Sequence, residues 1–472
     1  MIFTSLEFLV FFAIILLVRL GIKNVNSEKW FLLIASWLFY MSWNAPFVLL
    51  LIAVSTSDYF LGKRLHDESN LSMRKFLMAS SLFIDLGAIG FFKYANFLSG
   101  TWRQTIELAG IRSDPVFMEI ILPVGVSFFT FQSLSYTFDI YRKRMSPAAS
   151  WRDYNLFVAF FPQLIAGPIL KAIDFLPQLL ERRRPTAYMF ECGLAVFLLG
   201  AVKKSVLSDQ IAPQIDLVFA APLQFDALTL LVALVAFSAQ IFLDFSGYSD
   251  MAIGCACMMG FTFMDNFRMP YSSLSITEFW RRWHISLSTW LRDYVYISFG
   301  GNRRGTCRTH INIMATMLLG GLWHGASWNF VLWGAIHGLA LVVHKLWTSF
   351  RKPASSPTPR FAVRTFFASI LTLSIVILAW IPFRCMTLGD SYQYFLRLAN
   401  WEMDGVRSIP IQLVAIVSIV IVTHLLWKKD VVWYRSIPNS GIVVRATVYS
   451  SLLALIVIFG VSKAAPFIYF QF

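Results

Sequence analysis

Charged residues are scarce in this sequence. Only 14% of its 472 residues are Asp, Glu, Lys or Arg, against roughly 25% in a soluble domain, whereas 57% are hydrophobic. A soluble chain would be unable to bury this much apolar surface, so we expect part of the solvent to be lipid. No long polar block separates the apolar runs. We therefore expect an all-α polytopic membrane protein in which residues 1–472 form one integral membrane domain.

Several chemical signatures are also missing. The five cysteines lack the spacing of a zinc site or of a disulfide framework. The sequence has no phosphate-binding loop, no dinucleotide-binding glycine pattern and no Gly-x-Ser-x-Gly nucleophile motif. We expect no metal and no bound cofactor. Any group transfer would then proceed most simply by base-assisted attack of a substrate hydroxyl.

Acidic residues are outnumbered by basic ones, 26 to 40, which gives a net charge of +14. In a soluble protein this excess would suggest a nucleic-acid partner. Here Lys and Arg fall in short clusters between apolar runs, as in cytoplasmic loops, so we expect no nucleic acid. A phosphate-rich ligand such as coenzyme A is a second explanation. Counting the clusters along the chain places the N-terminus outside the cytoplasm, and the C-terminus as well if the last three apolar runs all span the membrane.

Long apolar runs predict the membrane-embedded segments. Residues 93–114 lie between two such runs and are expected to form an outer loop. The run at 226–264 is too long for one span. The predicted runs are 3–18, 30–42, 46–61, 76–92, 116–140, 188–202, 226–264, 311–347, 361–381, 409–427 and 442–461.

The segment 155–170 breaks the regular alternation of spans and loops. Pro162, Gly167 and Pro168 make a continuous spanning helix costly there, and basic residues lie on both sides. A re-entrant or in-plane segment that is shielded by protein fits this pattern. A Pro-kinked packing helix fits it equally well, and both interpretations remain open.

Polar side chains recur at helical spacing inside the run 226–264. Gln240, Asp244 and Tyr248 are four residues apart, so a helix places them on one face. A carboxylate in a membrane segment normally faces a bundle interior or a wet cavity. The three residues are therefore either substrate contacts or a buried network that locks helices together.

Two histidines in aromatic surroundings mark the stretch 278–333, which lies within a histidine-bearing core of about 120–347. His324 follows Gly320–Gly321 inside an apolar run, where the backbone can pack closely or change direction. A neutral, desolvated imidazole at this point would suit a general base. His284 lies at the edge of an Arg-rich polar run. For either histidine taken alone, a buried hydrogen-bonded side chain is the favoured explanation.

Five motifs, taken together and in this order, resemble the membrane-bound O-acyltransferase family. The resemblance is to the bacterial branch that contains the alginate O-acetylation membrane protein and the teichoic-acid D-alanyl transfer protein. It covers nearly the whole chain. The motifs are Leu-Pro-Val-Gly-Val-Ser-Phe-Phe-Thr-Phe-Gln at 122–132, Phe-Phe-Pro-Gln-Leu-Ile-Ala-Gly-Pro at 160–168, Asp-Phe-Ser-Gly-Tyr-Ser-Asp at 244–250, Phe-Trp-Arg-Arg-Trp-His-Ile-Ser at 279–286 and Leu-Trp-His-Gly at 322–325.

This resemblance implies a fold and a site. The fold would be a ring of about 10–12 tilted transmembrane helices, with re-entrant or in-plane helices, around a central funnel and tunnel. His324 would be the catalytic histidine and His284 the second active-site histidine, with no metal. The residues expected to line the pocket or tunnel are Trp283, Ser286, Arg282, Asp244, Tyr248, Gln240, Trp323 and Trp328.

The resemblance also implies an activity. An acyl group, most simply acetyl, would move from a cytoplasmic thioester donor such as acetyl-coenzyme A across the bacterial inner membrane. It would reach hydroxyls of a cell-envelope or extracellular polysaccharide, for example alginate or peptidoglycan. A periplasmic or extracellular partner of the SGNH-hydrolase-like type and the surrounding membrane lipid would be its partners. The alternative from another class is a transporter or flippase of a lipid-linked glycan or acyl carrier, but we find no inverted repeat.

The aromatic tail at 463–472 resembles the C-terminal motif of relatives and of a companion peptide in the teichoic-acid system, in which a tyrosine looks like an acyl relay. Tyr469 is the matching residue here. It would receive the acetyl group near His324 and pass it to the partner. An aromatic anchor at the membrane interface explains the same residues.

Overall fold

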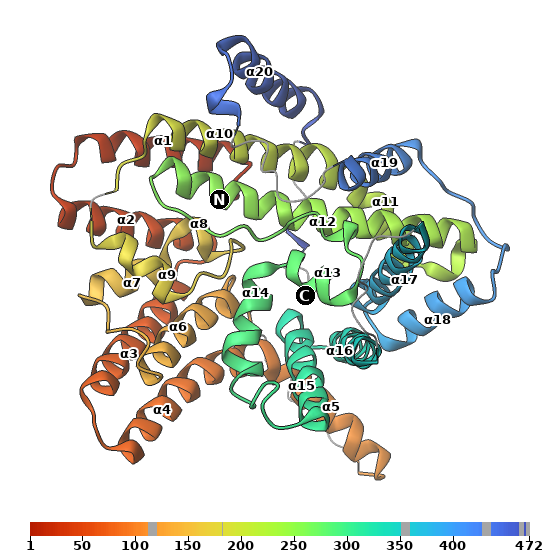
Figure 1. The fold of residues 1–472 in the computed structure, drawn as a ribbon, viewed down its shortest axis with the longest axis horizontal. Coiled ribbons are helices and arrows are strands. Elements are labelled where there is room, and N and C mark those ends of the chain that lie inside the picture. The colour runs from red at the N-terminus through yellow and green to blue at the C-terminus, as the bar shows by residue number, and fades with distance from the viewer. Residues whose placement is uncertain (112–119, 182, 351–358, 427–435, 462–466, 469–472) are drawn as a thin grey trace. The chain divides into compact units, whose positions relative to one another are not determined.

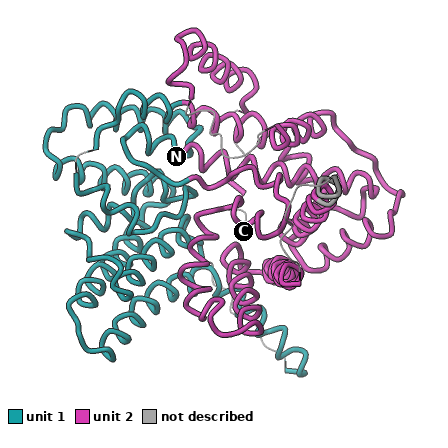
Figure 2. Tube along the Cα trace, in the orientation of Figure 1, with its two compact units in different colours: residues 1–194, 252–264 teal, residues 195–251, 265–472 magenta. Residues whose placement is uncertain are grey.

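The computed structural model describes residues 1–111, 120–181, 183–350, 359–426, 436–461 and 467–468. These residues are helical, apart from loops and one isolated bridge between Phe225 and Val406. The all-α class is therefore confirmed for this part of the chain. The chain forms two compact units, and the boundary passes through the helices α10 and α12 (Figure 2). The expectation of one integral domain stays a prediction.

Unit 1 comprises residues 1–194 and 252–264. Three of its helices begin at the side-chain caps Ser5, Asn24 and Asn70, whose oxygens accept first-turn N–H groups. The elements are α1 (Leu6–Gly21), α2 (Val25–Met41), α3 (Phe47–Asp67), α4 (Leu71–Ile89), the π-helix η1 (Gly90–Tyr94), α5 (Ala95–Leu108), α6 (Val126–Tyr141), α7 (Trp151–Ala159), α8 (Phe161–Leu164), α9 (Ala172–Phe175), the 3₁₀-helix η2 (Leu176–Leu179) and the start of α10 (Ala187–Ala201) (Figure 1).

The expected outer loop at 93–114 is wrong over most of its length. The π-helix η1 joins α4 to α5, so helical structure runs without a break over Leu71–Leu108. No Gly or Pro pair stops the chain at this point, and a π-helix lets one helix continue into the next. Part of the expected loop lies outside the described residues.

The predicted interruption at 155–170 is present in the structure. α7 ends at Ala159, α8 holds only four residues, and the backbone that follows is irregular as far as Lys171. The residues from Asn155 to Leu170 are buried. The segment is therefore neither one continuous helix nor a loop on the surface, and its irregular backbone is enclosed by protein as a membrane domain requires.

Unit 2 comprises residues 195–251 and 265–472. Sequence reasoning missed α18, although Thr387 and Asp390 form a capping box that marks its start. The elements are the end of α10, the π-helix η3 (Val202–Ser208), α11 (Asp209–Ala220), η4 (Pro222–Gln224), α12 (Ala227–Met258), η5 (Pro270–Ser272), α13 (Ile276–Arg282), α14 (Ile285–Trp290), the π-helix η6 (Leu291–Tyr296), α15 (Thr306–His324), α16 (Trp328–Ser349), α17 (Pro359–Arg384), α18 (Leu388–Ala399), α19 (Ile411–Leu426), η8 (Ile437–Asn439) and α20 (Ile442–Phe459).

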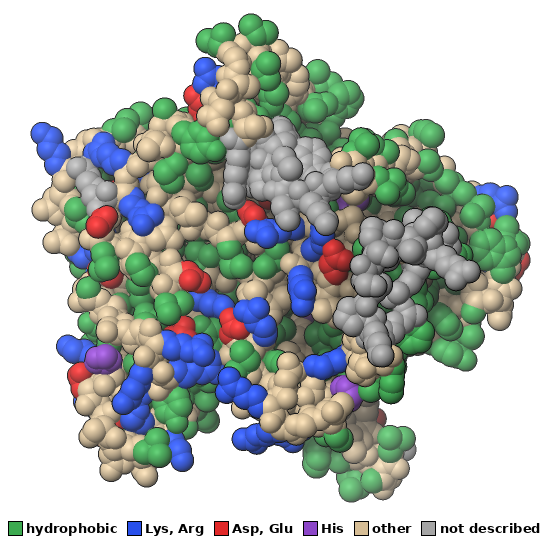
Figure 3. Space-filling view, viewed as in Figure 1, with side chains coloured by type: hydrophobic (Ala, Val, Ile, Leu, Met, Phe, Trp, Pro, Cys, Tyr) green, Lys and Arg blue, Asp and Glu red, His purple; other side chains and the backbone are tan. Residues whose placement is uncertain are grey.

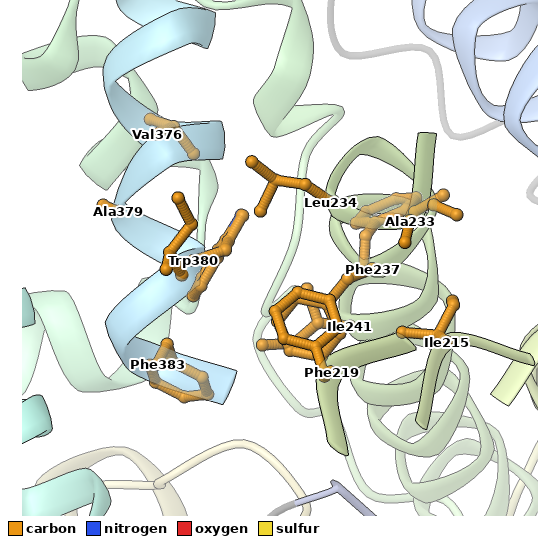
Figure 4. Packing of buried hydrophobic residues seen from close by; sticks show 14 of the residues in the cluster. Ile215, Phe219, Ala233, Leu234, Phe237, Ile241, Val376, Ala379, Trp380 and Phe383 are labelled. Carbon is orange, nitrogen blue, oxygen red and sulfur yellow. The ribbon is translucent and has the colours of Figure 1, made fainter. Parts of the chain in front are cut away.

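The core of unit 2 brings together helices that are far apart in the sequence. Figure 4 shows Val376 and Trp380 of α17 near Leu234 and Phe237 of α12. Phe219 of α11 packs against Phe237, with ring centroids 5.4 Å apart. Burial of such large side chains contributes about 1.5–3 kcal/mol each, which fixes α11, α12 and α17 together.

Five helices in the described part of the chain are long and apolar enough to cross a membrane. α20 is one of them, and Leu452 is its one residue that the structure describes as buried. A mainly apolar helix that is largely exposed fits contact with lipid. The other apolar helices are shorter, so the expected count of about 10–12 spanning helices stays a prediction.

α15 and α16 pack closely because glycines face the neighbouring backbone. A Cβ atom on Gly321 would lie 2.2 Å from the Phe330 carbonyl oxygen, and one on Gly334 would lie 2.5 Å from the Met317 carbonyl oxygen. The chain reverses between His324 and Trp328. The close packing and the change of direction expected near Gly320–Gly321 are therefore confirmed.

We predict that Gly321→Ala destabilises the protein by about 1–3 kcal/mol, because the added methyl group overpacks this helix pair. Thermal unfolding in detergent measures the effect. The control is Gly87→Ala in α4, where a Cβ meets no atom within 4 Å. That variant should unfold at or above the wild-type temperature, since Ala favours helix over Gly. An unchanged unfolding temperature for Gly321→Ala would contradict the packing argument.

Candidate active site

His324 is the last residue of α15 and is 3% exposed. Aromatic rings surround its imidazole. The ring centroids of Trp323 and Trp333 lie 5.0 Å from that of His324, and that of Phe383 lies 5.3 Å away. The turn between α15 and α16 therefore places a histidine inside an apolar, water-poor wall. This is the desolvated setting that the sequence predicted for a general base.

His284 lies beside His324, with ring centroids 6.4 Å apart. It joins α13 to α14 with a left-handed backbone, at φ 43° and ψ 55°. A residue with a Cβ atom adopts this conformation at a cost, and such residues cluster at functional sites. The structure thus brings together the two histidines that are 40 positions apart in the sequence.

Asn266 holds His284. Its Oδ1 accepts the backbone N–H of Ser286 at 3.2 Å and the Ser286 hydroxyl at 2.9 Å, and its Nδ2 donates to Ser249 Oγ at 3.0 Å. Because the backbone N–H can only donate, the atom that faces it must be the amide oxygen. His284 Nδ1 lies 3.2 Å from this same oxygen. His284 therefore carries its proton on Nδ1 and leaves a lone pair on Nε2.

His284 is completely buried, and its Nε2 has no hydrogen-bond partner among the residues that the structure describes. Phe245 lies against it edge to face, with ring centroids 4.6 Å apart. Burial lowers the pKa of His284 to about 3, because no water stabilises the charged imidazolium. His284 is therefore neutral at physiological pH, and its Nε2 can accept a proton or a hydrogen bond.

Three predicted lining residues belong to the surroundings of this histidine pair. Trp323 contacts both imidazoles, with centroid distances of 5.0 Å to His324 and 5.7 Å to His284. Ser286 joins His284 through Asn266. Trp283 is buried against the rings of Phe267 and Phe279.

The predicted alignment of polar residues on α12 holds for Asp244 and Tyr248, which both meet the C-terminal segment. Asp244 Oδ2 accepts the backbone N–H of Ile468 at 2.8 Å, and the Tyr248 ring lies 4.9 Å from that of Phe467. Asp244 Oδ1 pairs with Lys204 at 2.7 Å. Tyr469 lies outside the described residues.

Two further lining candidates lie differently. Gln240 is buried on α12, and its backbone carbonyl accepts the Ser208 hydroxyl at 3.4 Å. The Trp328 side chain is 47% exposed at the start of α16. Trp333 of the same helix, which sequence reasoning did not single out, contacts His324.

Arg282 lies in a basic pocket. Its side chain pairs with Glu278 at 2.8 Å. Arg268, Arg281 and His344 line the same cavity, which has a volume of about 540 Å³. A second basic cavity of about 510 Å³ lies along η6 and the loop that follows, lined by Arg292, Arg303 and Arg304 among others. Figure 3 shows Lys and Arg side chains over the part of unit 2 where α13 to α15 lie.

Among the described residues, no group of three or more His, Cys, Asp and Glu side chains is placed to hold a metal ion. The expectation of no metal stays a prediction.

Comparison with known proteins decides the family. The model of the membrane-bound O-acyltransferase family matches residues 27–386, which include both histidines. The chain belongs to this family. It is a multi-pass membrane O-acyltransferase, an enzyme that transfers an acyl group to a hydroxyl.

Similar members of this O-acyltransferase family are bacterial. The chain is 41% identical over 414 residues to the probable alginate O-acetylase AlgI of Pseudomonas aeruginosa, covering 86% of this chain and 76% of that protein. It is 34% identical to the protein of the same name from Pseudomonas putida, over all of both chains. It is 32% identical to the peptidoglycan O-acetyltransferase of Helicobacter pylori, covering 78% of this chain and 73% of that protein.

Sequence reasoning missed residues of the O-acyltransferase that support the site from other elements. Asn266 gives no signal, because one Asn after a long apolar run is unremarkable. Lys204 gave a misleading signal. With Lys203 it ends an apolar run and looks like a loop charge, but the structure buries it between Asp244 and Asp209. The roles of Asn266 and Lys204 depend on contacts between elements that are distant in the sequence, which a local pattern does not reveal.

The neutral state of His284 in this O-acyltransferase predicts a pH effect on stability. Its folded pKa of about 3 lies below the unfolded value of about 6.5, so the unfolded chain binds one more proton between these values. Stability from this group is therefore full above about pH 6.5 and is lost as the pH falls toward 3. His284→Asn, which tolerates the left-handed backbone, should lose less stability between pH 7 and pH 5 than wild type.

Unfolding temperatures at several pH values, measured in detergent for both proteins, test this difference. His66→Asn provides the control, because His66 is exposed on α3 and should leave the pH dependence at the wild-type value. Parallel curves for wild type and His284→Asn would contradict a buried neutral imidazole.

Proposed function

We propose that this enzyme moves an acetyl group from a thioester donor on the cytoplasmic side of a bacterial inner membrane toward hydroxyls of a cell-envelope or extracellular polysaccharide. The observation that carries the proposal is the buried pair His284 and His324, whose ring centroids lie 6.4 Å apart among aromatic side chains. The names of the relatives, alginate O-acetylase and peptidoglycan O-acetyltransferase, support acetyl as the group and a polysaccharide as the acceptor.

His324 acts as the general base in this proposal. It takes the proton of the attacking hydroxyl while the oxygen attacks the thioester carbonyl. A C–O bond forms, the C–S bond breaks, and the proton passes to the leaving thiolate. His284 offers the lone pair of its Nε2 within the same buried space. Asn266 keeps the proton of His284 on Nδ1. The aromatic wall limits the access of water, so that attack by the bound hydroxyl is faster than hydrolysis of the thioester.

The donor in this proposal is acetyl-coenzyme A, held by its phosphates. Arg268, Arg281 and Arg282 line one cavity, and guanidinium groups bind phosphate through paired charge-assisted hydrogen bonds. Arg292, Arg303 and Arg304 line the second cavity. Tyr296 and Asn302 line this second cavity and also an apolar cavity of about 430 Å³ that contains Trp280 and Leu291. Basic and mainly apolar surfaces therefore adjoin, which suits a thioester whose phosphates are followed by a long pantetheine arm.

The proposed setting is the ring of about 10–12 tilted helices with a central funnel and tunnel that the family resemblance implies. The buried short helices α7 and α8 support it, because irregular backbone is tolerated in a membrane only inside protein. Both chain termini would lie outside the cytoplasm. An SGNH-hydrolase-like partner on that side would then complete the transfer to the polysaccharide.

Tyr469 serves as an acyl relay in this scheme. Its phenol would attack the thioester with His324 as base, so that a tyrosyl ester forms as the thiol leaves. The partner would then take the acetyl group from this ester. Support comes from the two preceding residues, Phe467 and Ile468, which are buried against α12.

We predict that His324→Ala lowers acetyl transfer at least about 10²-fold, the usual contribution of a general base. The measurements are thiol release from acetyl-coenzyme A by purified protein and polysaccharide acetylation in cells. His337→Ala is the control, since it removes another buried imidazole that packs against Trp333 at 4.7 Å. Undiminished turnover in His324→Ala would exclude His324 as the general base. Wild-type protein that releases no thiol would instead favour a transporter or flippase.

We predict that Tyr469→Phe abolishes polysaccharide acetylation and leaves the protein folded, because only the phenolic oxygen is lost. Ester-linked acetate on the isolated polymer is the readout. Tyr392→Phe, an equal change at an exposed residue of α18, should acetylate as wild type does. Wild-type acetylation by Tyr469→Phe would contradict the role of Tyr469 as an acyl relay. An aromatic anchor at the membrane interface would then explain the tail.

A further inference from the structure

We propose that Asp244, held in place by Lys204, is a positioning residue that docks the C-terminal segment Phe467–Ile468 beside the histidine pair. This inference rests on the proposed function, because the docked segment directly precedes the proposed relay residue. It gives a specific task to a buried ion cluster that the chemistry of the histidines does not require.

Asp244 uses both of its carboxylate oxygens. Oδ1 lies 2.7 Å from Lys204 Nζ, and Oδ2 accepts the backbone N–H of Ile468 at 2.8 Å. Lys204 also pairs with Asp209 at 2.8 Å. All three charged side chains and Ile468 are buried. The tail amide is therefore held by a charge-assisted hydrogen bond away from water, which is about twice as strong as a neutral one.

Close packing of the end of α10, which η3 directly follows, on α12 makes this ion pair possible. A Cβ atom on Gly200 would lie 2.5 Å from the Gly247 carbonyl oxygen, and one on Gly247 would lie 2.8 Å from the Gly200 carbonyl oxygen. The π-helix η3 then directs two successive lysines at α12. Lys203 pairs with Asp250 at 2.6 Å, and Lys204 pairs with Asp244.

The same platform holds the chain at two points, one on each side of residues 462–466. The backbone N–H of Val461 donates to the Ser205 carbonyl of η3 at 3.2 Å. Gln210 of α11 donates to the Phe459 carbonyl at the end of α20 at 2.7 Å. Ile468 then binds Asp244. Both anchors belong to η3, α11 and α12, so the register of the tail is set by one rigid group of elements.

The docked segment adjoins the histidines through a single ring. The Phe467 centroid lies 5.6 Å from that of Phe245, and the Phe245 centroid lies 4.6 Å from that of His284. Tyr248 covers Phe467 as well, at 4.9 Å. A shift of the tail would therefore displace the reacting groups. Misplacement by about 1 Å can lower the reaction rate by about 10²-fold.

A purely structural ion pair is the competing explanation, and energetics argue against it. Burying Lys204 with two carboxylates costs desolvation that well-packed apolar residues would avoid, so such a cluster is a poor source of stability. The ion cluster instead fixes the position of the tail. The cluster supplies one fixed acceptor for one backbone amide, and apolar packing alone would let the tail slide.

The test combines hydrogen–deuterium exchange of the peptide that contains Ile468 with acetylation assays on the full-length protein. In Asp244→Ala we expect exchange of this peptide to rise at least about tenfold, since a charged hydrogen bond is lost. Polysaccharide acetylation should fall by a similar factor. Thiol release from acetyl-coenzyme A should persist, because the histidine pair is intact and water can replace the mispositioned acceptor. A merely structural role would lower both activities together.

Two further variants complete the test. Phe467→Ala loosens the tail without touching the ion cluster, so it should reproduce the faster exchange even if Asp244→Ala folds poorly. Asp250→Ala is the matched control, because it breaks the Lys203 pair on the same two elements without contacting the described tail residues. It should leave tail exchange and acetylation unchanged.

Unchanged exchange in both Asp244→Ala and Phe467→Ala would overturn the docking. Faster exchange with wild-type polysaccharide acetylation would overturn the positioning role. A wild-type protein without any acetyl transfer would refute the proposed function, and the exchange experiment would still decide whether Asp244 docks the tail.

Discussion

The contact between the end of α10 and α12 at Gly200 and Gly247 is the constraint on which the rest of the site depends. Backbone lies against backbone there, so the lysine side chains of η3 reach the carboxylates of α12. A buried carboxylate needs such a partner, because its uncompensated charge would cost several kcal/mol. Asp244 then has one oxygen left for a backbone amide. Through Phe245, the same helix also forms the wall of the histidine site.

Chemistry was easier to predict from the sequence than geometry. Aromatic residues and glycines around His324 predicted a desolvated imidazole at a change of chain direction, and the structure has both features. The partners of the charged residues were not predictable, because ion pairs between distant elements leave no local pattern. Lys204 looked like a loop charge for this reason. The join of α4 to α5 was missed because a π-helix carries no clear sequence signal.

Active-site order in this enzyme comes from interactions of two kinds. His324 is packed among aromatic rings that limit the access of water. His284 is held by hydrogen bonds and by a left-handed backbone, which the Asn266 amide stabilises through Ser286. Aromatic packing thus surrounds His324, and a polar network orients His284. A substitution that loosens aromatic packing should disturb the first more than the second.

The π-helix η3 has a consequence for how this family varies. A π-helix is equivalent to one residue inserted into an α-helix. Removing one residue from Val202–Ser208 would turn the flanking helix by about 100°, the rotation of one α-helical step. Both lysines would then leave the carboxylates of α12. In an alignment of relatives that keep these ion pairs, gaps should therefore fall outside this segment, even where neighbouring loops differ in length.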